Sequence, residues 1–215
     1  MMRLIASVFC LCLAVPPPAC AQLGRFVAEG GTAAADFRLL DRDGRTVALS
    51  SYRGKVILIT FWATWCIPCR EEMPALERLW RNTRSSYLGV IAIDAGDDDA
   101  AISSFLRHID PSPSFTIALD RDLTVTKTWH VDGLPKSFII DAEGRIAYQA
   151  MGAVEFDSAQ TLDILHGLLT TPLASNHASG SSPVDRLTMT AGGSMKYSIA
   201  IEQRRRIEKA VRSLR

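Results

Sequence analysis

Cysteine is scarce in this chain, and only five cysteines occur along its 215 residues. Three of them, Cys10, Cys12 and Cys20, lie near the N-terminus, which leaves Cys66 and Cys69. A structural zinc site needs four ligands, usually from two Cys-x-x-Cys pairs. The chain has one such pair and four histidines, none near that pair in sequence, so zinc is disfavoured.

Two further interpretations of the pair also fit poorly. A disulfide between Cys66 and Cys69 closes almost no loop, whereas structural disulfides stabilise exported proteins mainly by closing long loops. A peroxide-reducing thiol enzyme would carry the pattern Pro-x-x-x-Thr-x-x-Cys. Here Ile59 and Ala63 occupy the proline and threonine positions.

The N-terminal apolar run, Leu4 to Val15, falls short of the roughly 20 residues that a membrane-spanning helix needs. Arg3 precedes this run and Ala19-Cys20-Ala21 follows it, which is the pattern of a secretory signal peptide cleaved after Ala21. A retained anchor and lipid attachment at Cys20 remain open alternatives. Export to the periplasm is expected, and cleavage would leave Cys66 and Cys69 as the only cysteines.

Hydrophobic periodicity predicts alternating strands and helices from residue 22 to residue 171. An Asp-Gly turn joins two short alternating runs, Phe37–Leu40 and Thr46–Leu49, into a hairpin. The segment "KVILITFWA" predicts a strand buried on both faces, and a helix follows from Cys66. Further strands and helices follow, ending in a hairpin and a helix capped by Asp157 or Ser158. This order predicts an α/β sandwich around a mixed sheet.

The net charge of +1 hides an asymmetry. Residues 22–171 carry an excess of Asp and Glu, whereas residues 172–215 carry an excess of Lys and Arg. Residues 172–194 have the Ser, Thr and Gly content of a linker. Residues 195–215 predict a basic amphipathic helix, which suits either contact with an anionic membrane or a solvated extension. For an exported protein we expect no nucleic-acid partner.

The pair itself predicts thiol chemistry. Cys66 follows a buried strand and is expected at the first position of a helix, where unpaired N–H groups and the helix dipole stabilise a thiolate. Cys69 lies one turn further in, within bonding reach but less exposed. Cys66 is therefore predicted as the attacking thiol and Cys69 as the resolving thiol. Pro68 suits the first turn because its missing N–H is not needed there.

The segments "FWATWCIPC" and "GLPKSFIIDAEGRI" resemble the thioredoxin superfamily, most closely its TlpA/ResA branch of exported thiol–disulfide oxidoreductases. The resemblance runs from about Ala35 to Leu169. It implies a thioredoxin-like three-layer sandwich with a mixed central sheet, an N-terminal β-hairpin and a strand-helix insertion. No metal or other cofactor is implied.

The resemblance also implies roles for particular residues. Cys66 and Cys69 would be the redox pair, and Pro135 would match the superfamily's cis-proline, which contacts substrate backbone. Glu72 would tune the thiols, with an exposed helix carboxylate as the alternative. Trp65 and Leu134 would contact the substrate, with core packing as the alternative for Trp65. Lys136 would either lie near Cys66 or face solvent. Thr60 stands where thioredoxin has a buried aspartate, so a proton relay would use Glu72 or water.

The uncharged Ile67-Pro68 between the cysteines, together with the resemblance, implies a reductase. It would take electrons from a membrane thiol carrier and pass them to disulfide-containing client proteins, such as apocytochrome c or copper-delivery proteins. Two alternatives remain open: an oxidase or isomerase of protein disulfides, and a non-enzymatic adaptor that handles metal or haem.

Overall fold

The computed structural model describes residues 24–83 and 87–170. The predicted signal peptide, linker and tail helix lie outside these residues, as does Thr171 at the end of the predicted domain. The strands are β1 (Val27–Ala28), β2 (Arg38–Asp41), β3 (Thr46–Ala48), β4 (Val56–Trp62), β5 (Leu88–Asp94), β6 (Thr116–Leu119), β7 (Lys136–Ile140) and β8 (Ile146–Met151). The helices are α1 (Ile67–Thr83), α2 (Asp99–His108), α3 (Thr124–Thr128), α4 (Ala159–Thr170) and the 3₁₀ turn η1 (Leu49–Tyr52).

The strands form one sheet in the order β1-β8-β7-β4-β5-β6-β2-β3. β4, β5 and β6 run parallel, whereas the other neighbours pair antiparallel, so the mixed sheet is confirmed. The predicted N-terminal hairpin is β2 and β3. Gly44 in its turn has a φ of 77°, a conformation that favours glycine. The hairpin joins the edge of the main sheet because β2 also pairs with β6.

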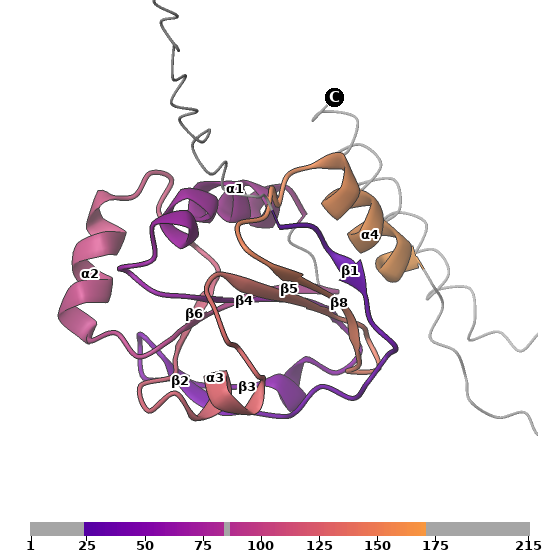
Figure 1. Ribbon diagram of the computed structural model, residues 1–215, viewed down its shortest axis with the longest axis horizontal. Coiled ribbons are helices and arrows are strands. Elements are labelled where there is room, and N and C mark those ends of the chain that lie inside the picture. Colours follow the sequence, from indigo (N-terminus) through magenta and orange to yellow (C-terminus); the bar gives the residue numbers. More distant parts are fainter. Residues whose placement is uncertain (1–23, 84–86, 171–215) are drawn as a thin grey trace, which may run out of the picture.

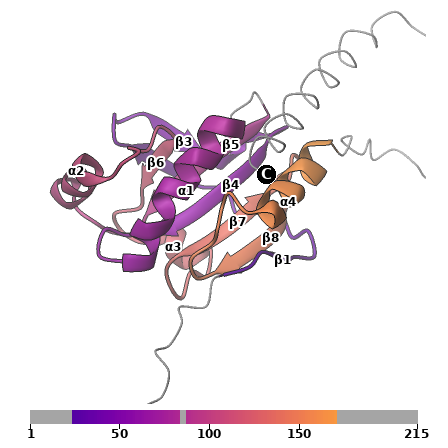
Figure 2. The ribbon, with the colours of Figure 1, turned by 90° about the horizontal axis from the view of Figure 1, so that it is seen from above.

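Helices cover both faces of the sheet and make the predicted three-layer sandwich (Figures 1 and 2). α1, α2 and α4 pack on one face, where their apolar side chains share a cluster with Leu58 and Trp62 of β4. α3 and η1 pack on the other face, in a cluster that includes Ile59 and Phe61. Successive residues of β4 therefore point into different cores, as the period of a strand requires.

The central strands β4 and β5 are buried along their whole length. Each large apolar side chain removed from water there stabilises the fold by about 1.5–3 kcal/mol. Thr60 is the polar exception in β4 and is fully buried. A buried hydroxyl is costly unless it is hydrogen-bonded, so its partners matter for the site.

Side chains cap the N-termini of α2 and α4. The carboxylate of Asp98 accepts the N–H of Ala101, 2.7 Å away, at the start of α2. Of the two candidate caps for α4, Ser158 accepts the N–H of Thr161 at 3.3 Å. The two-residue strand β1 was not predicted, and it pairs with the edge of β8.

Candidate active site

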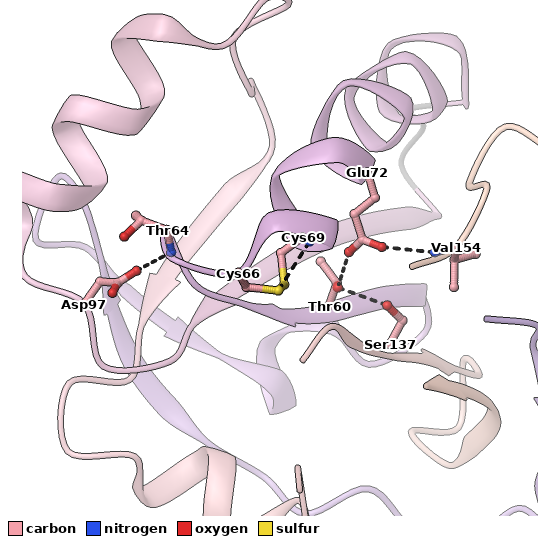
Figure 3. Close-up of a disulfide and its surroundings, with 8 residues drawn as sticks. All are labelled: Thr60, Thr64, Cys66, Cys69, Glu72, Asp97, Ser137 and Val154. Carbon is pink, nitrogen blue, oxygen red and sulfur yellow. Dashed lines mark hydrogen bonds between the residues drawn. A yellow bond between two sulfur atoms is a disulfide. The ribbon is translucent and has the colours of Figure 1, made fainter. Parts of the chain in front are cut away.

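The cysteine pair lies where β4 gives way to α1 (Figure 3). Helix α1 begins at Ile67, so Cys66 occupies the N-cap rather than the predicted first helical position. Its Sγ accepts the N–H of Cys69 at 3.3 Å, the contact that a cap oxygen makes with the third helical residue. The sulfur of Cys66 therefore faces a backbone donor at the positive end of the helix.

A disulfide joins Cys66 to Cys69, with their Cα atoms 5.3 Å apart. Cys66 retains 5% of its surface exposed, whereas Cys69 has none. An incoming thiol can therefore reach only the Cys66 side of this bond. The geometry supports the predicted order of attack, in which Cys66 meets the client and Cys69 resolves.

Glu72 lies on α1 one turn beyond Cys69, and it is buried, so the alternative of an exposed helix carboxylate is excluded. The hydroxyl of Thr60 donates to Oε1 of Glu72 at 3.3 Å, and the N–H of Val154 donates to Oε2 at 3.1 Å. The hydroxyl of Ser137 donates to Oγ1 of Thr60 at 3.0 Å. A polar network thus crosses from β7 through β4 to α1 (Figure 3).

Burial raises the pKa of Glu72 to about 8, because the ionised carboxylate loses its hydration. The hydrogen bonds from Val154 and Thr60 oppose this shift, since they favour the charged form. A carboxyl with such a pKa can both hold and release a proton near neutral pH. Its position on the helix face of Cys69 suits proton exchange with the resolving thiol.

Leu134 and Pro135 lie at the same end of the sheet as the cysteines. The antiparallel register pairs Phe61 near the end of β4 with Lys136 at the start of β7, and the Leu134–Pro135 bond is cis. The carbonyl of Pro135 already accepts the N–H of Gly152 at 2.9 Å. Within the described residues no backbone hydrogen bond reaches Leu134, so its backbone is the group left to pair with a bound strand.

Exposed apolar side chains flank Cys66 on both sides. Trp65 is 69% exposed, which excludes core packing as its role, and Ile67 is 65% exposed. Next to them a cleft of about 740 Å³ separates the start of α1 from α2, with Thr64, Arg70 and Phe105 among its lining residues. Exposed apolar groups beside a reactive sulfur suit contact with another protein.

Comparison with known proteins agrees with this geometry. Residues 31–149 match the model of the AhpC/TSA family. The thiol-disulfide oxidoreductase ResA of Bacillus thuringiensis subsp. konkukian is 34% identical over 124 residues, which cover 58% of this chain and 70% of that protein. ResA of Bacillus subtilis is 30% identical over 124 residues, covering 58% and 68%.

The chain belongs to the AhpC/TSA family.

Among solved structures, the chain superimposes with a TM-score of 0.59 on a protein assigned as thiol:disulfide interchange protein DsbE from Chlorobium tepidum. The two are 30% identical over 66% of this chain and 99% of the other. The pneumococcal exposed lipoprotein thioredoxin Etrx1 from Streptococcus pneumoniae gives a TM-score of 0.55 at 27% identity, over 62% and 100%. This AhpC/TSA family member is a thiol–disulfide oxidoreductase of the ResA/DsbE type.

Lys136 does not extend into solvent in this member of the AhpC/TSA family. Its Nζ donates to the carbonyl of His130 at 2.8 Å and lies 3.4 Å from Oδ1 of Asp132, with the side chain 14% exposed. Its charge is engaged at the turn before β7. It is thus held by the preceding loop instead of extending freely into solvent.

Sequence reasoning missed several residues of the site. Thr60 was considered only as a missing aspartate, yet it links Glu72 to Ser137. The available signal was a small hydroxyl residue inside each of two largely apolar strands, Thr60 in β4 and Ser137 in β7. Asp97, whose carboxylate accepts the N–H of Thr64, gave no local signal because its partner lies on another loop (Figure 3).

The described residues contain neither a candidate metal site nor a candidate membrane-spanning helix. In residues 24–83 and 87–170 no group of three or more His, Cys, Asp or Glu side chains is arranged to hold a metal ion. No helix in that part of the chain is long and apolar enough to cross a membrane.

Proposed function

We propose that this oxidoreductase is an exported reductase of client-protein disulfides. The thiolate of Cys66 attacks one sulfur of the client disulfide and forms a mixed disulfide, releasing the other client sulfur as a thiolate. The thiolate of Cys69 then attacks Sγ of Cys66, which frees the second client sulfur and leaves the Cys66–Cys69 disulfide. The client gains two electrons and takes up two protons, while the enzyme dithiol is oxidised.

The observation that carries the proposal is Glu72 buried one helical turn from Cys69. With a pKa of about 8, its carboxyl can accept the proton of the Cys69 thiol as that thiol becomes the nucleophile. Water is largely excluded, because Cys69 is fully buried. Thr60 and Val154 orient the carboxyl through their hydrogen bonds.

Two observations favour reduction over oxidation. A strong oxidant needs a stabilised reduced form, usually through positive charge beside the attacking thiolate. Ile67 and Pro68 between the cysteines are uncharged, and Lys136 is held by the carbonyl of His130. Ile67 and Pro68 therefore add no charge beside the Cys66 thiolate, and the ammonium group of Lys136 is shared with a backbone carbonyl and with Asp132.

The direction of electron flow is tested by equilibrating the protein with reduced and oxidised glutathione. A reductase is expected near the potential of thioredoxin, about −270 mV. A value near that of DsbA, about −120 mV, would instead support a protein-disulfide oxidase. The Cys69→Ser variant, which cannot close the disulfide, is the matched control and should show no two-electron transition.

The clients and the location are part of the same proposal. The N-terminal sequence pattern supports export to the periplasm, by a cleaved signal peptide or a retained anchor, and the similarity to an exposed lipoprotein thioredoxin supports an extracytoplasmic site of action. Clients with a Cys-x-x-Cys-His haem site or a copper-delivery role fit a reductase, and a membrane thiol carrier would supply the electrons. Capture of mixed disulfides on Cys69→Ser in cells identifies these clients. An adaptor that only carries metal or haem would trap none.

Residues 22–171 would form the catalytic domain, followed by the linker and the basic tail helix. We propose that the tail contacts an anionic membrane surface through its arginines. Co-sedimentation with vesicles containing phosphatidylserine compares the full chain with a chain ending at Thr171. Equal binding of the two would remove the membrane contact from the proposal.

A further inference from the structure

The loop that carries Trp65 and Cys66 is tied to the loop that follows β5. The N–H of Ala95 donates to the carbonyl of Trp62 at 2.9 Å, where β4 and β5 end side by side. Further along, the N–H of Thr64 donates to Oδ2 of Asp97 (Figure 3). Two hydrogen bonds thus join loops that are more than thirty residues apart in sequence.

The N–H of Thr64 depends on this carboxylate. The N–H of Cys66 donates to the carbonyl of Ala63 at 3.2 Å, which closes a tight turn with Thr64 and Trp65 at its centre. The turn offers the Thr64 N–H no backbone acceptor of its own. Ala63 is fully buried and Thr64 half-buried, so an unpaired N–H here is costly.

Asp97 is itself positioned by a hydrogen bond to Asp94. Its N–H donates to Oδ1 of Asp94 at 2.9 Å, and Asp94 is only 1% exposed at the end of β5. Burial, and then the charge of Asp97, raise the pKa of Asp94 to about 8. At neutral pH Asp94 is therefore mostly protonated, which avoids two adjacent negative charges beneath the active-site loop.

We propose that Asp97 is a positioning residue for thiol–disulfide exchange. By accepting the N–H of Thr64, it fixes the turn that presents Trp65 and the sulfur of Cys66 to the client. The inference rests on the proposed exchange at Cys66 and assigns a role to a loop outside the cysteine motif. Among the described residues, the hydrogen bonds of Asp97 go to Thr64 and Asp94 and none goes to either cysteine.

The test compares Asp97→Ala with Asp97→Asn. Both variants remove the negative charge, but only asparagine keeps an acceptor for the N–H of Thr64. The ratio of their reaction rates therefore measures the effect of this hydrogen bond alone. Asp99→Ala is the matched control, because Asp99 is exposed, carries the same charge and pairs with Arg121 instead. Each protein is assayed for insulin-disulfide reduction and for the rate at which dithiothreitol reduces its own disulfide.

Asp97→Ala is expected to react about tenfold more slowly than Asp97→Asn in both assays, a difference of about 1.4 kcal/mol. Asp99→Ala should react at the rate of the wild type in both assays. Equal rates for the alanine and asparagine variants would overturn the positioning role. If the wild type reduces no insulin, the proposed function fails, and the dithiothreitol rates alone then decide the role of Asp97. Far-UV circular dichroism and the Thr64 amide exchange rate separate misfolding from a displaced loop.

Discussion

Oγ1 of Thr60 lies 3.3 Å from Oε1 of Glu72, at the point where β4 passes beneath the first turns of α1. Among the residues that the structure describes, the one further side-chain partner of this pair is Ser137, which donates to Thr60. The three side chains come from different elements, and all are buried. The hydroxyl of Thr60 can donate to an ionised Glu72 or accept from a protonated one, so the network fits both states of the carboxyl.

Thr60→Val preserves the shape of the side chain and removes its hydroxyl. We expect a loss of about 1–3 kcal/mol in the free energy of unfolding, because Glu72 and Ser137 each lose a buried partner. The pKa of Glu72 should rise further, since the Thr60 hydrogen bond lowers it. Urea unfolding and carboxyl titration by NMR measure the two effects. Ser137→Ala leaves the Thr60–Glu72 hydrogen bond intact and should lower the free energy of unfolding by less than Thr60→Val does. An equal loss in the two variants would contradict the central role of Thr60.

Glu72→Gln should reduce the dependence of stability on pH, leaving the part that Asp94 contributes. The pKa of Glu72 is 4.5 in its ordinary state and about 8 when folded, so between these values the folded protein holds a proton that the unfolded chain releases. Glu72 should therefore contribute a loss of stability as pH rises from about 5 to about 8, by at most about 1.4 kcal/mol per pH unit, in addition to the loss that Asp94 contributes over the same range. Above the folded pKa, this dependence ends.

Urea unfolding between pH 5 and pH 9 checks this slope for the wild type and Glu72→Gln. Glu71→Gln is the matched control, because Glu71 precedes Glu72 on the exposed side of α1. The control should follow the wild type. A Glu72→Gln variant with the same slope as the wild type would show that Glu72 is not the group that titrates.

The two single cysteine variants should differ in reactivity. With Cys69→Ser the remaining Cys66 keeps its position at the helix N-cap, whereas with Cys66→Ser the remaining Cys69 stays fully buried. Iodoacetamide should alkylate the first variant more than about tenfold faster at pH 7, since reactivity follows thiolate content and exposure. Mass spectrometry over time measures both rates. Faster alkylation of Cys69 would reverse the proposed order of attack.

Trp65→Ala should separate client contact from stability. Trp65 is 69% exposed, so the free energy of unfolding should change by no more than about 0.5 kcal/mol. Insulin reduction should fall about tenfold if the ring packs against clients, since aromatic anchors dominate such contacts. Reduction by dithiothreitol should be unchanged. Val27→Ala, at a position 62% exposed on β1, is the control and should alter neither assay.

Much of the fold follows from local patterns. The Asp-Gly turn, the continuous apolar run of β4 and the helical spacing after Cys66 each depend on residues close together in the chain. These patterns predicted the hairpin, the mixed sheet and the helix that begins beside the cysteine pair. They did not predict that β2 would pair with β6, because strand order depends on contacts between distant segments.

The local pattern of residues was enough to predict the chemistry of the site: two cysteines at the start of a helix after a buried strand. Tertiary structure decided how that chemistry is controlled. Glu72 had an exposed alternative until the packing of α1 on β4 buried it, which raises its pKa. The links from Thr60 to Ser137 and from Asp97 to Thr64 also exist only in the folded chain. Burial and long-range hydrogen bonds depend on which segments pack together, and no local pattern encodes that.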